Sequence, residues 1–217
     1  MTNVKPSDIF NEHGFVIIHD IFTLEEIEIF TNYALMQEKR QGINGDIQSP
    51  GAFSEYADPL MESLMIHLHP IIEQCTDLEL YPTYSYYRVY RNGHKLSKHK
   101  DRKSCEISVS LALGYSYDSN TYRWPLFVNE NEIFLKPGDI AIYKGVELSH
   151  WREPFNIQED AYHCQAFLHY VNANGKYKDY MFDGRESIGD LERINKDLDY
   201  NFQPDTVKYI TDSMMLG

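Results

Sequence analysis

Short alternating segments, separated by glycine and proline turns, constrain the fold of this chain most. Residues 107–113 read Ile-Ser-Val-Ser-Leu-Ala-Leu, and this two-residue period is typical of a β-strand. Other strand-like runs, one pair of them separated by the turn Lys136-Pro-Gly-Asp139, span residues 84–90, 132–135, 140–143 and 164–171. Many short strands with such turns predict an antiparallel sandwich or barrel over residues 80–172.

The flanking stretches have a different pattern. Thr23 and Glu26 form a capping-box pattern ahead of apolar residues at helical spacing, which predicts a helix from residue 24. Residues 14–18 predict a short strand, residues 59–75 a second helix, and residues 188–198 a third. Because no proline-rich linker separates the stretches, we predict one domain over 1–217, with helical support in 1–80, a β core in 80–172 and a helical tail in 173–217.

Charge and cysteine usage exclude several classes of protein. The chain of 217 residues has 20 Lys and Arg against 33 Asp and Glu, a net charge of −13, which disfavours a nucleic-acid partner. No apolar run is long enough to cross a membrane or to form a signal peptide. Cys75, Cys105 and Cys164 form no disulfide or zinc-knuckle spacing, so we expect a reducing, cytoplasmic compartment.

One short motif indicates a metal site. His99 and Asp101 are two residues apart in a strand-like segment, so their side chains point the same way. His150, which follows the predicted turn at 136–139 and the strand after it, is the best candidate for a third ligand. Two imidazoles and one carboxylate on one face of an octahedron are the donor set of non-haem Fe(II) oxygenases, with three positions left open.

The segment resembles the Fe(II)- and 2-oxoglutarate-dependent dioxygenases, in the branch similar to prolyl 4-hydroxylases and phytanoyl-CoA hydroxylases. Tyr90-Arg-Asn-Gly93 before His99-Lys-Asp101, and Gly138-Asp139 before His150, match the family in order and spacing. The resemblance implies a distorted double-stranded β-helix, a jelly roll, with flanking helices. It also implies Fe(II) bound by His99, Asp101 and His150, with Tyr90 on the distal carboxylate of 2-oxoglutarate.

The sequence departs from the family at one position. An Arg or Lys usually follows the distal histidine by nine to fifteen residues and pairs with that carboxylate, and here His163 takes its place. Three explanations stay open: His163 and Gln165 bind the carboxylate, Arg152 reaches it from another direction, or the cosubstrate is not 2-oxoglutarate. We favour Arg152 because a guanidinium is charged at any physiological pH.

The resemblance therefore predicts a hydroxylase that acts on a C–H bond of a peptide or small molecule. It would consume dioxygen and 2-oxoglutarate and release succinate and CO₂, with ascorbate as an auxiliary reductant. Two alternatives remain at this stage: a catalytically silent jelly-roll module that binds a metal or small acid, and a cupin-like metal isomerase or lyase that needs no dioxygen. The sequence does not indicate the primary substrate or the oligomeric state.

Overall fold

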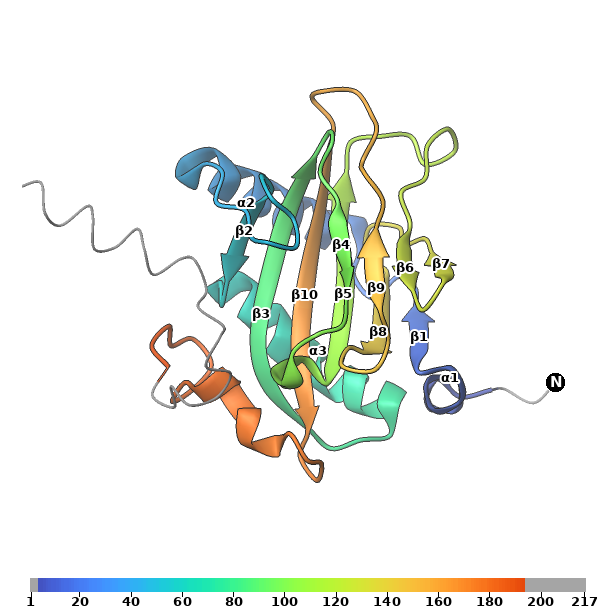
Figure 1. Cartoon of the computed structure of the whole chain (residues 1–217), viewed down its shortest axis with the longest axis vertical. Helices are drawn as coiled ribbons and strands as arrows, with labels where there is room; N and C mark the ends of the chain where they lie inside the picture. The colour runs from blue at the N-terminus through green and yellow to red at the C-terminus, as the bar shows by residue number, and fades with distance from the viewer. Residues whose placement is uncertain (1–3, 194–217) are drawn as a thin grey trace, which may run out of the picture.

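Two antiparallel β-sheets face each other in the computed structural model, which describes residues 4–193 (Figure 1). The larger sheet has the strand order β1 (Phe15–Ile18), β8 (Ile140–Lys144), β5 (Ile107–Tyr115), β10 (Tyr162–Asn172), β3 (Leu80–Arg91) and β2 (Phe53–Tyr56). The smaller has the order β4 (Leu96–His99), β9 (His150–Arg152), β6 (Leu126–Val128) and β7 (Asn131–Ile133). The mainly β jelly-roll class predicted from the sequence is confirmed.

Helices support the outer face of the larger sheet. They are α1 (Pro6–His13), α2 (Leu24–Gln41) and α3 (Pro59–Thr76). The described residues also form two 3₁₀ segments, η1 (Lys103–Cys105) and η2 (Lys178–Gly184). The capping box expected at Thr23 and Glu26 is present at the start of α2. Asp58 caps α3 by accepting hydrogen bonds from the backbone of Leu60 and Met61.

Strand β5 is buried on both faces. Its odd-numbered residues from Ile107 to Leu113 belong to the main hydrophobic core, which also includes residues of the three helices. Its small residues Ser108, Ser110 and Ala112 are equally buried. The sequence alternation therefore separates the main core from a second face that carries two serines and an alanine, and both faces are buried.

Two sequence-based predictions need correction. The strand expected over residues 132–135 ends at Ile133, because only β7 pairs with β6 there. The helix expected over residues 188–198 does not begin at Ile188. Residues 188 and 189 instead lie in a turn, residues 190–192 have no regular structure, and Arg193 forms an isolated bridge with Arg185. Residues 194–198 lie outside the described part of the chain.

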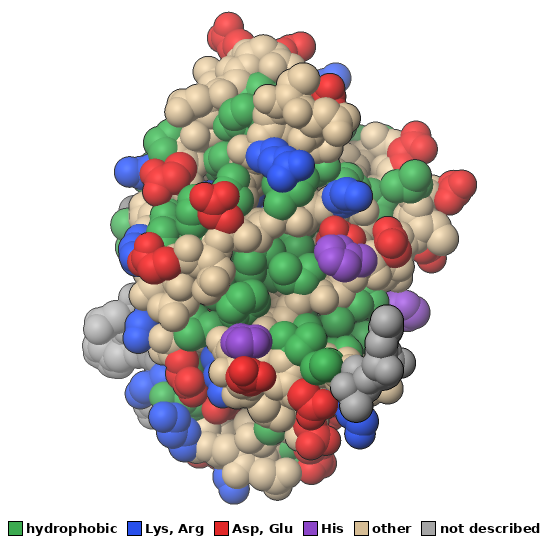
Figure 2. Space-filling view, turned by 90° about the vertical axis from the view of Figure 1, so that its right-hand side faces the viewer, with side chains coloured by type: hydrophobic (Ala, Val, Ile, Leu, Met, Phe, Trp, Pro, Cys, Tyr) green, Lys and Arg blue, Asp and Glu red, His purple; other side chains and the backbone are tan. Residues whose placement is uncertain are grey.

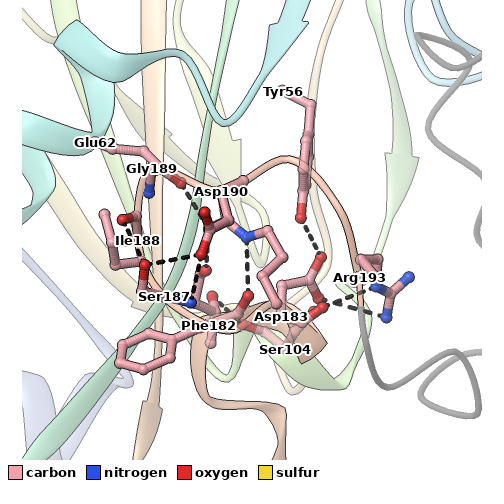
Figure 3. A network of polar contacts seen from close by, with 12 residues as sticks. Tyr56, Glu62, Ser104, Phe182, Asp183, Ser187, Ile188, Gly189, Asp190 and Arg193 are labelled. Atoms are coloured by element: carbon pink, nitrogen blue, oxygen red, sulfur yellow. Dashed lines mark hydrogen bonds and ion pairs between the residues drawn. The ribbon is translucent and has the colours of Figure 1, made fainter.

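The segment after β10 is anchored to the body of the domain by buried charges (Figure 3). Asp183 accepts two hydrogen bonds from Arg102, at 2.6 and 2.7 Å, and one from the Tyr56 hydroxyl at 2.7 Å. Arg185 donates to Glu62 of α3 at 2.6 Å and to the backbone carbonyl of Thr83 at 2.8 Å. These contacts bring residues 178–193 against helix α3 and strands β2 and β3.

The exterior mixes charge types. Figure 2 shows acidic, basic and apolar side chains side by side on one face of the molecule. A search of the described helices finds none with the length and hydropathy needed to cross a bilayer.

Candidate metal centre

The three residues of the predicted ligand set come together in space. Antiparallel pairing of β4 with β9 places His99 opposite His150, and their ring centroids lie 4.3 Å apart. Asp101 lies two residues beyond β4 and directs Oδ1 toward both rings, 3.5 Å from His99 Nε2 and 3.4 Å from His150 Nε2. One ligand atom from each residue lies within 4.8 Å of the other two.

The two histidines are held so that the same nitrogen faces the centre. His99 Nδ1 lies 2.7 Å from the carbonyl oxygen of Ser97, and His150 Nδ1 lies 3.1 Å from that of Leu148. A carbonyl only accepts, so each Nδ1 carries the hydrogen and each neutral ring keeps its Nε2 lone pair free. This is the arrangement that backbone partners impose on metal-binding histidines. The donor set therefore fits a first-row divalent ion.

In the metal-free protein, Asp101 and His150 each stabilise the charged form of the other. Burial alone would raise the pKa of Asp101, but the two imidazoles hold it well below its ordinary value. Burial alone would lower the pKa of His150, but the Asp101 carboxylate outweighs burial, and the pKa is raised. The metal-free site therefore favours an ionised Asp101 and a proton on His150, and a metal has to displace that proton.

Metal binding should therefore weaken in mild acid. A metal ion needs neutral His150, so affinity is fully present above the raised pKa of His150 and is lost as the pH falls through it. Below that point we expect about a tenfold loss of apparent affinity per pH unit. Co²⁺ titrations across the weakly acidic range, with an NMR titration of the His150 ring in metal-free protein, measure this. An affinity that stays constant until below the ordinary histidine pKa would contradict the expectation.

A cavity of about 410 Å³ opens onto the three residues. Its remaining lining comes mainly from β3, from the stretch before β2 and from β10, and includes the aromatic residues Tyr56, Tyr84, Tyr86, Tyr143 and Phe167. Tyr143 packs on His150 with a ring centroid distance of 4.8 Å. The cavity therefore has room for an organic molecule of modest size next to the ligand cluster.

The four residues expected to hold a cosubstrate are not among those that line this cavity. Tyr90, Arg152, His163 and Gln165 are all buried. Arg152 donates to the carbonyl of Trp124 at 2.5 Å and to Gln165 Oε1 at 3.1 Å. His163 contacts Gln165 at 2.9 Å through Nε2. The structure thus gathers the four around one point.

Arg152 is unusual because it is a buried cation without a carboxylate partner among the described residues. It is 2% exposed, its Nε has no hydrogen-bond partner, and the nearby Tyr90 hydroxyl has none either. Burial and Arg152 together hold the pKa of His163 well below its ordinary value, so that ring is neutral. An isolated buried charge is costly. The unpartnered Arg152 Nε–H and Tyr90 hydroxyl are donors of the kind that a carboxylate accepts from, and Arg152 supplies the positive charge.

Tyr143 connects the two regions. It lines the cavity, and its pKa is raised by burial first and by Asp101 second, while Arg152 acts in the opposite direction. The phenol therefore lies within electrostatic range of both the ligand cluster and Arg152.

Sequence reasoning missed Arg88, which lines the cavity on β3. Its guanidinium pairs with Asp46 and donates to Gln48 at 2.9 Å. The period of two that links it to Tyr86 and Tyr90 placed it on the inward face and could have identified it. The partner Asp46, 42 residues earlier in an irregular segment, had no recognisable signal.

Comparisons with known proteins give structural matches only. No family model matches the chain, and no curated protein matches it in sequence.

Many solved structures share its fold. A prolyl 4-hydroxylase from Pseudomonas putida is 15% identical, with 75% of this chain and 96% of that chain covered and a TM-score of 0.58. SnoK, a non-haem alpha-ketoglutarate-dependent carbocyclase from nogalamycin biosynthesis, is 13% identical, with 79% and 85% covered and a TM-score of 0.63. HygX from Streptomyces hygroscopicus, with nickel, 2-oxoglutarate and hygromycin B bound, is 13% identical, with 76% and 86% covered and a TM-score of 0.59.

The matching structures are Fe(II)- and 2-oxoglutarate-dependent oxygenases, as the sequence motifs indicated. The chain has their double-stranded β-helix fold. At these identities the likeness establishes the fold, and activity has to be argued from the site.

Proposed function

We propose that this protein is an Fe(II)- and 2-oxoglutarate-dependent oxygenase whose metal ligands are His99, Asp101 and His150. The observation that carries the proposal is the convergence of His99 Nε2, His150 Nε2 and Asp101 Oδ1 beside a cavity. Two nitrogens and one oxygen from a single side of the site leave the other coordination positions to exogenous groups. When bound, Fe(II) with 2-oxoglutarate supplies the activation of dioxygen for attack on a C–H bond, with succinate and CO₂ as coproducts.

We further assign the distal carboxylate of 2-oxoglutarate to Arg152, with the Tyr90 hydroxyl as a second donor. Arg152 can offer its free Nε–H, and a charged donor is the strongest partner for a carboxylate. Gln165 orients the guanidinium, and neutral His163 supports Gln165 in turn. The cosubstrate would extend past Tyr143, which lines the cavity and lies within electrostatic range of both Asp101 and Arg152.

The protein's own contribution is to fix an open ligand set and to restrict water. Backbone carbonyls orient both imidazoles before metal arrives, so little reorganisation accompanies binding. The aromatic side chains around the cavity limit the volume left for solvent near the metal.

Release of succinate tests this function directly. Purified protein with Fe(II), ascorbate and 2-oxoglutarate should form succinate in air even without a primary substrate, at a slow uncoupled rate, and omission of metal should abolish the signal. A catalytically silent binding module would hold Co²⁺ and 2-oxoglutarate without forming succinate. An isomerase or lyase would show no dependence on dioxygen. Either result would replace the proposal.

The assignment of Arg152 predicts a specific loss. Replacing Arg152 with Gln removes the charge that pairs with the distal carboxylate, and loss of a charge-assisted pair of this kind costs about 2–5 kcal/mol, at least about 30-fold in affinity. The KM for 2-oxoglutarate in the succinate assay should rise by that factor while Co²⁺ affinity stays unchanged.

Arg88→Gln is the matched control, because Arg88 is also a buried arginine but already pairs with Asp46. We expect that variant to leave 2-oxoglutarate affinity near the original value. If Arg88→Gln raises the KM and Arg152→Gln does not, the cosubstrate lies in the open cavity beside Arg88, and the assignment to Arg152 is wrong.

A further inference from the structure

The second oxygen of Asp101 has its own partner. Asp101 Oδ1 faces the two imidazoles, whereas Oδ2 lies 2.6 Å from the hydroxyl of Ser108. Ser108 is fully buried on β5, and its register partner on β10 is His169. His169 Nδ1 lies 3.0 Å from the same hydroxyl. Ser108 thus links its sequence neighbour Asp101 to His169 of β10, in a line of three side chains that ends at the carboxylate.

The direction of these hydrogen bonds follows from counting hydrogens. An ionised carboxylate only accepts, so the single hydroxyl hydrogen of Ser108 points to Asp101. The other acceptor within reach, the carbonyl of Cys105, lies at 3.3 Å and carries no charge, so it competes poorly. With its hydrogen committed, Ser108 can only accept from His169, whose Nδ1 must carry a hydrogen. The chain therefore runs from His169 through Ser108 to Asp101.

The backbone around Asp101 leaves space for this contact and for little else. A Cβ at Gly145 would lie 2.4 Å from Asp101 Oδ2 and 2.5 Å from Ser108 Oγ. The carbonyl of Gly145 also accepts a hydrogen bond of 2.9 Å from the backbone N–H of Asp101. The other groups that face His169 are the ring of Tyr84, at a centroid distance of 4.6 Å, and the Cys105 thiol, which belongs to the same cluster of ligand-type atoms.

We propose that Ser108 and His169 are positioning residues that hold Asp101 with Oδ1 toward the metal and Oδ2 away from it. The inference rests on the proposed metal centre and adds the reason why the carboxylate binds through one oxygen. A carboxylate free to rotate could present both oxygens and occupy a position that the cosubstrate needs. Ser108 prevents this by engaging Oδ2, and His169 keeps the Ser108 hydroxyl turned toward Asp101.

Conservative variants of His169 separate positioning from packing. In His169→Asn the side-chain amide nitrogen lies where Nδ1 was and still donates to Ser108, whereas in His169→Gln the amide lies farther out, where Nε2 was. We expect Ser108→Ala and His169→Gln to weaken Co²⁺ binding about 10- to 100-fold, as removal of partners of metal ligands does. His169→Asn should stay within about threefold of the original protein, on the same scale.

The measurements are Co²⁺ affinity from its visible absorption, the intensity of that band, and thermal unfolding of the metal-free proteins. The band should change in Ser108→Ala and His169→Gln but not in His169→Asn. Because the two residues act in one line of hydrogen bonds, the double variant Ser108→Ala/His169→Gln should lose no more Co²⁺ affinity than the single variant with the larger loss. Equal losses in Asn and Gln variants, additive losses, or unchanged affinity in both single variants would overturn the inference.

The outcome also distinguishes this inference from the proposed function. If the unaltered protein binds Co²⁺ and the variants behave as expected but no succinate forms, the oxygenase proposal fails and the positioning chain stands. If succinate forms but Ser108→Ala binds Co²⁺ as well as the unaltered protein, the chain alone is wrong. If the unaltered protein binds no Co²⁺, both fail.

Discussion

Replacing Asp101 with Ala should abolish succinate formation and weaken Co²⁺ binding by more than about 100-fold, the upper end of the range for residues that only support a ligand. The carboxylate contributes the one anionic donor of the set, and its Oδ1 is the atom that both imidazoles face. Without it, two neutral nitrogens remain, and these bind divalent ions weakly. The succinate assay and the Co²⁺ titration measure the two effects independently.

Asp179→Ala is the matched control, since it makes the same chemical change at an exposed position of η2. It should leave turnover and Co²⁺ affinity unchanged. Circular dichroism of metal-free Asp101→Ala checks that the fold persists. Undiminished turnover in a folded Asp101→Ala variant would reject the assigned centre altogether.

Glu62→Ala should destabilise the protein by about 3–5 kcal/mol, the usual cost of removing one partner of a buried ion pair. Glu62 is 2% exposed and accepts hydrogen bonds of 2.6 Å from Arg185 and from the backbone N–H of Gly189. Its loss leaves the Arg185 guanidinium buried without its counter-charge. The midpoint of urea unfolding should fall accordingly, with the free energy of unfolding taken from linear extrapolation.

Two controls define the origin of that loss. Ser63→Ala changes the next residue of α3, which is exposed, and should change the free energy of unfolding by less than about 0.5 kcal/mol. The double variant Glu62→Leu/Arg185→Met removes both charges and should be more stable than Glu62→Ala, because no charge remains uncompensated. If Glu62→Ala unfolds at the same urea concentration as Ser63→Ala, the pair contributes nothing.

The strands of the fold were predictable where their sequence alternates and ambiguous where it does not. The period of two in residues 107–113 identified β5, and the turn at 136–139 identified β8. The three-residue strands β6, β7 and β9 are too short to show a period, and their pairing in the smaller sheet defines them. The strand predicted over 132–135 was placed by its apolar residues, yet the ladder ends at Ile133.

The residues of the candidate metal site were likewise predictable only in part. The spacing of His99 and Asp101 and the position of His150 were enough to propose one metal cluster from the sequence. The role of a residue such as Ser108 depends on what its face of the strand meets, and a small polar side chain in an alternating strand normally suggests solvent. Here that face contacts Asp101, seven residues earlier, and His169, 61 residues later. The sequence alone contains no pattern that predicts this contact of Ser108 with Asp101 and His169.

The anchoring of Asp183 has a practical consequence for anyone who shortens this protein. The last strand ends at Asn172, so a topology diagram suggests that everything beyond it is dispensable. Yet Asp183 accepts hydrogen bonds from Tyr56 and Arg102, two residues that line the cavity. Arg102 directly follows Asp101 in the sequence. We expect a version cut after β10 to keep every candidate metal ligand and every described strand, yet to bind different molecules, because the cut removes the carboxylate that holds two residues of the cavity wall.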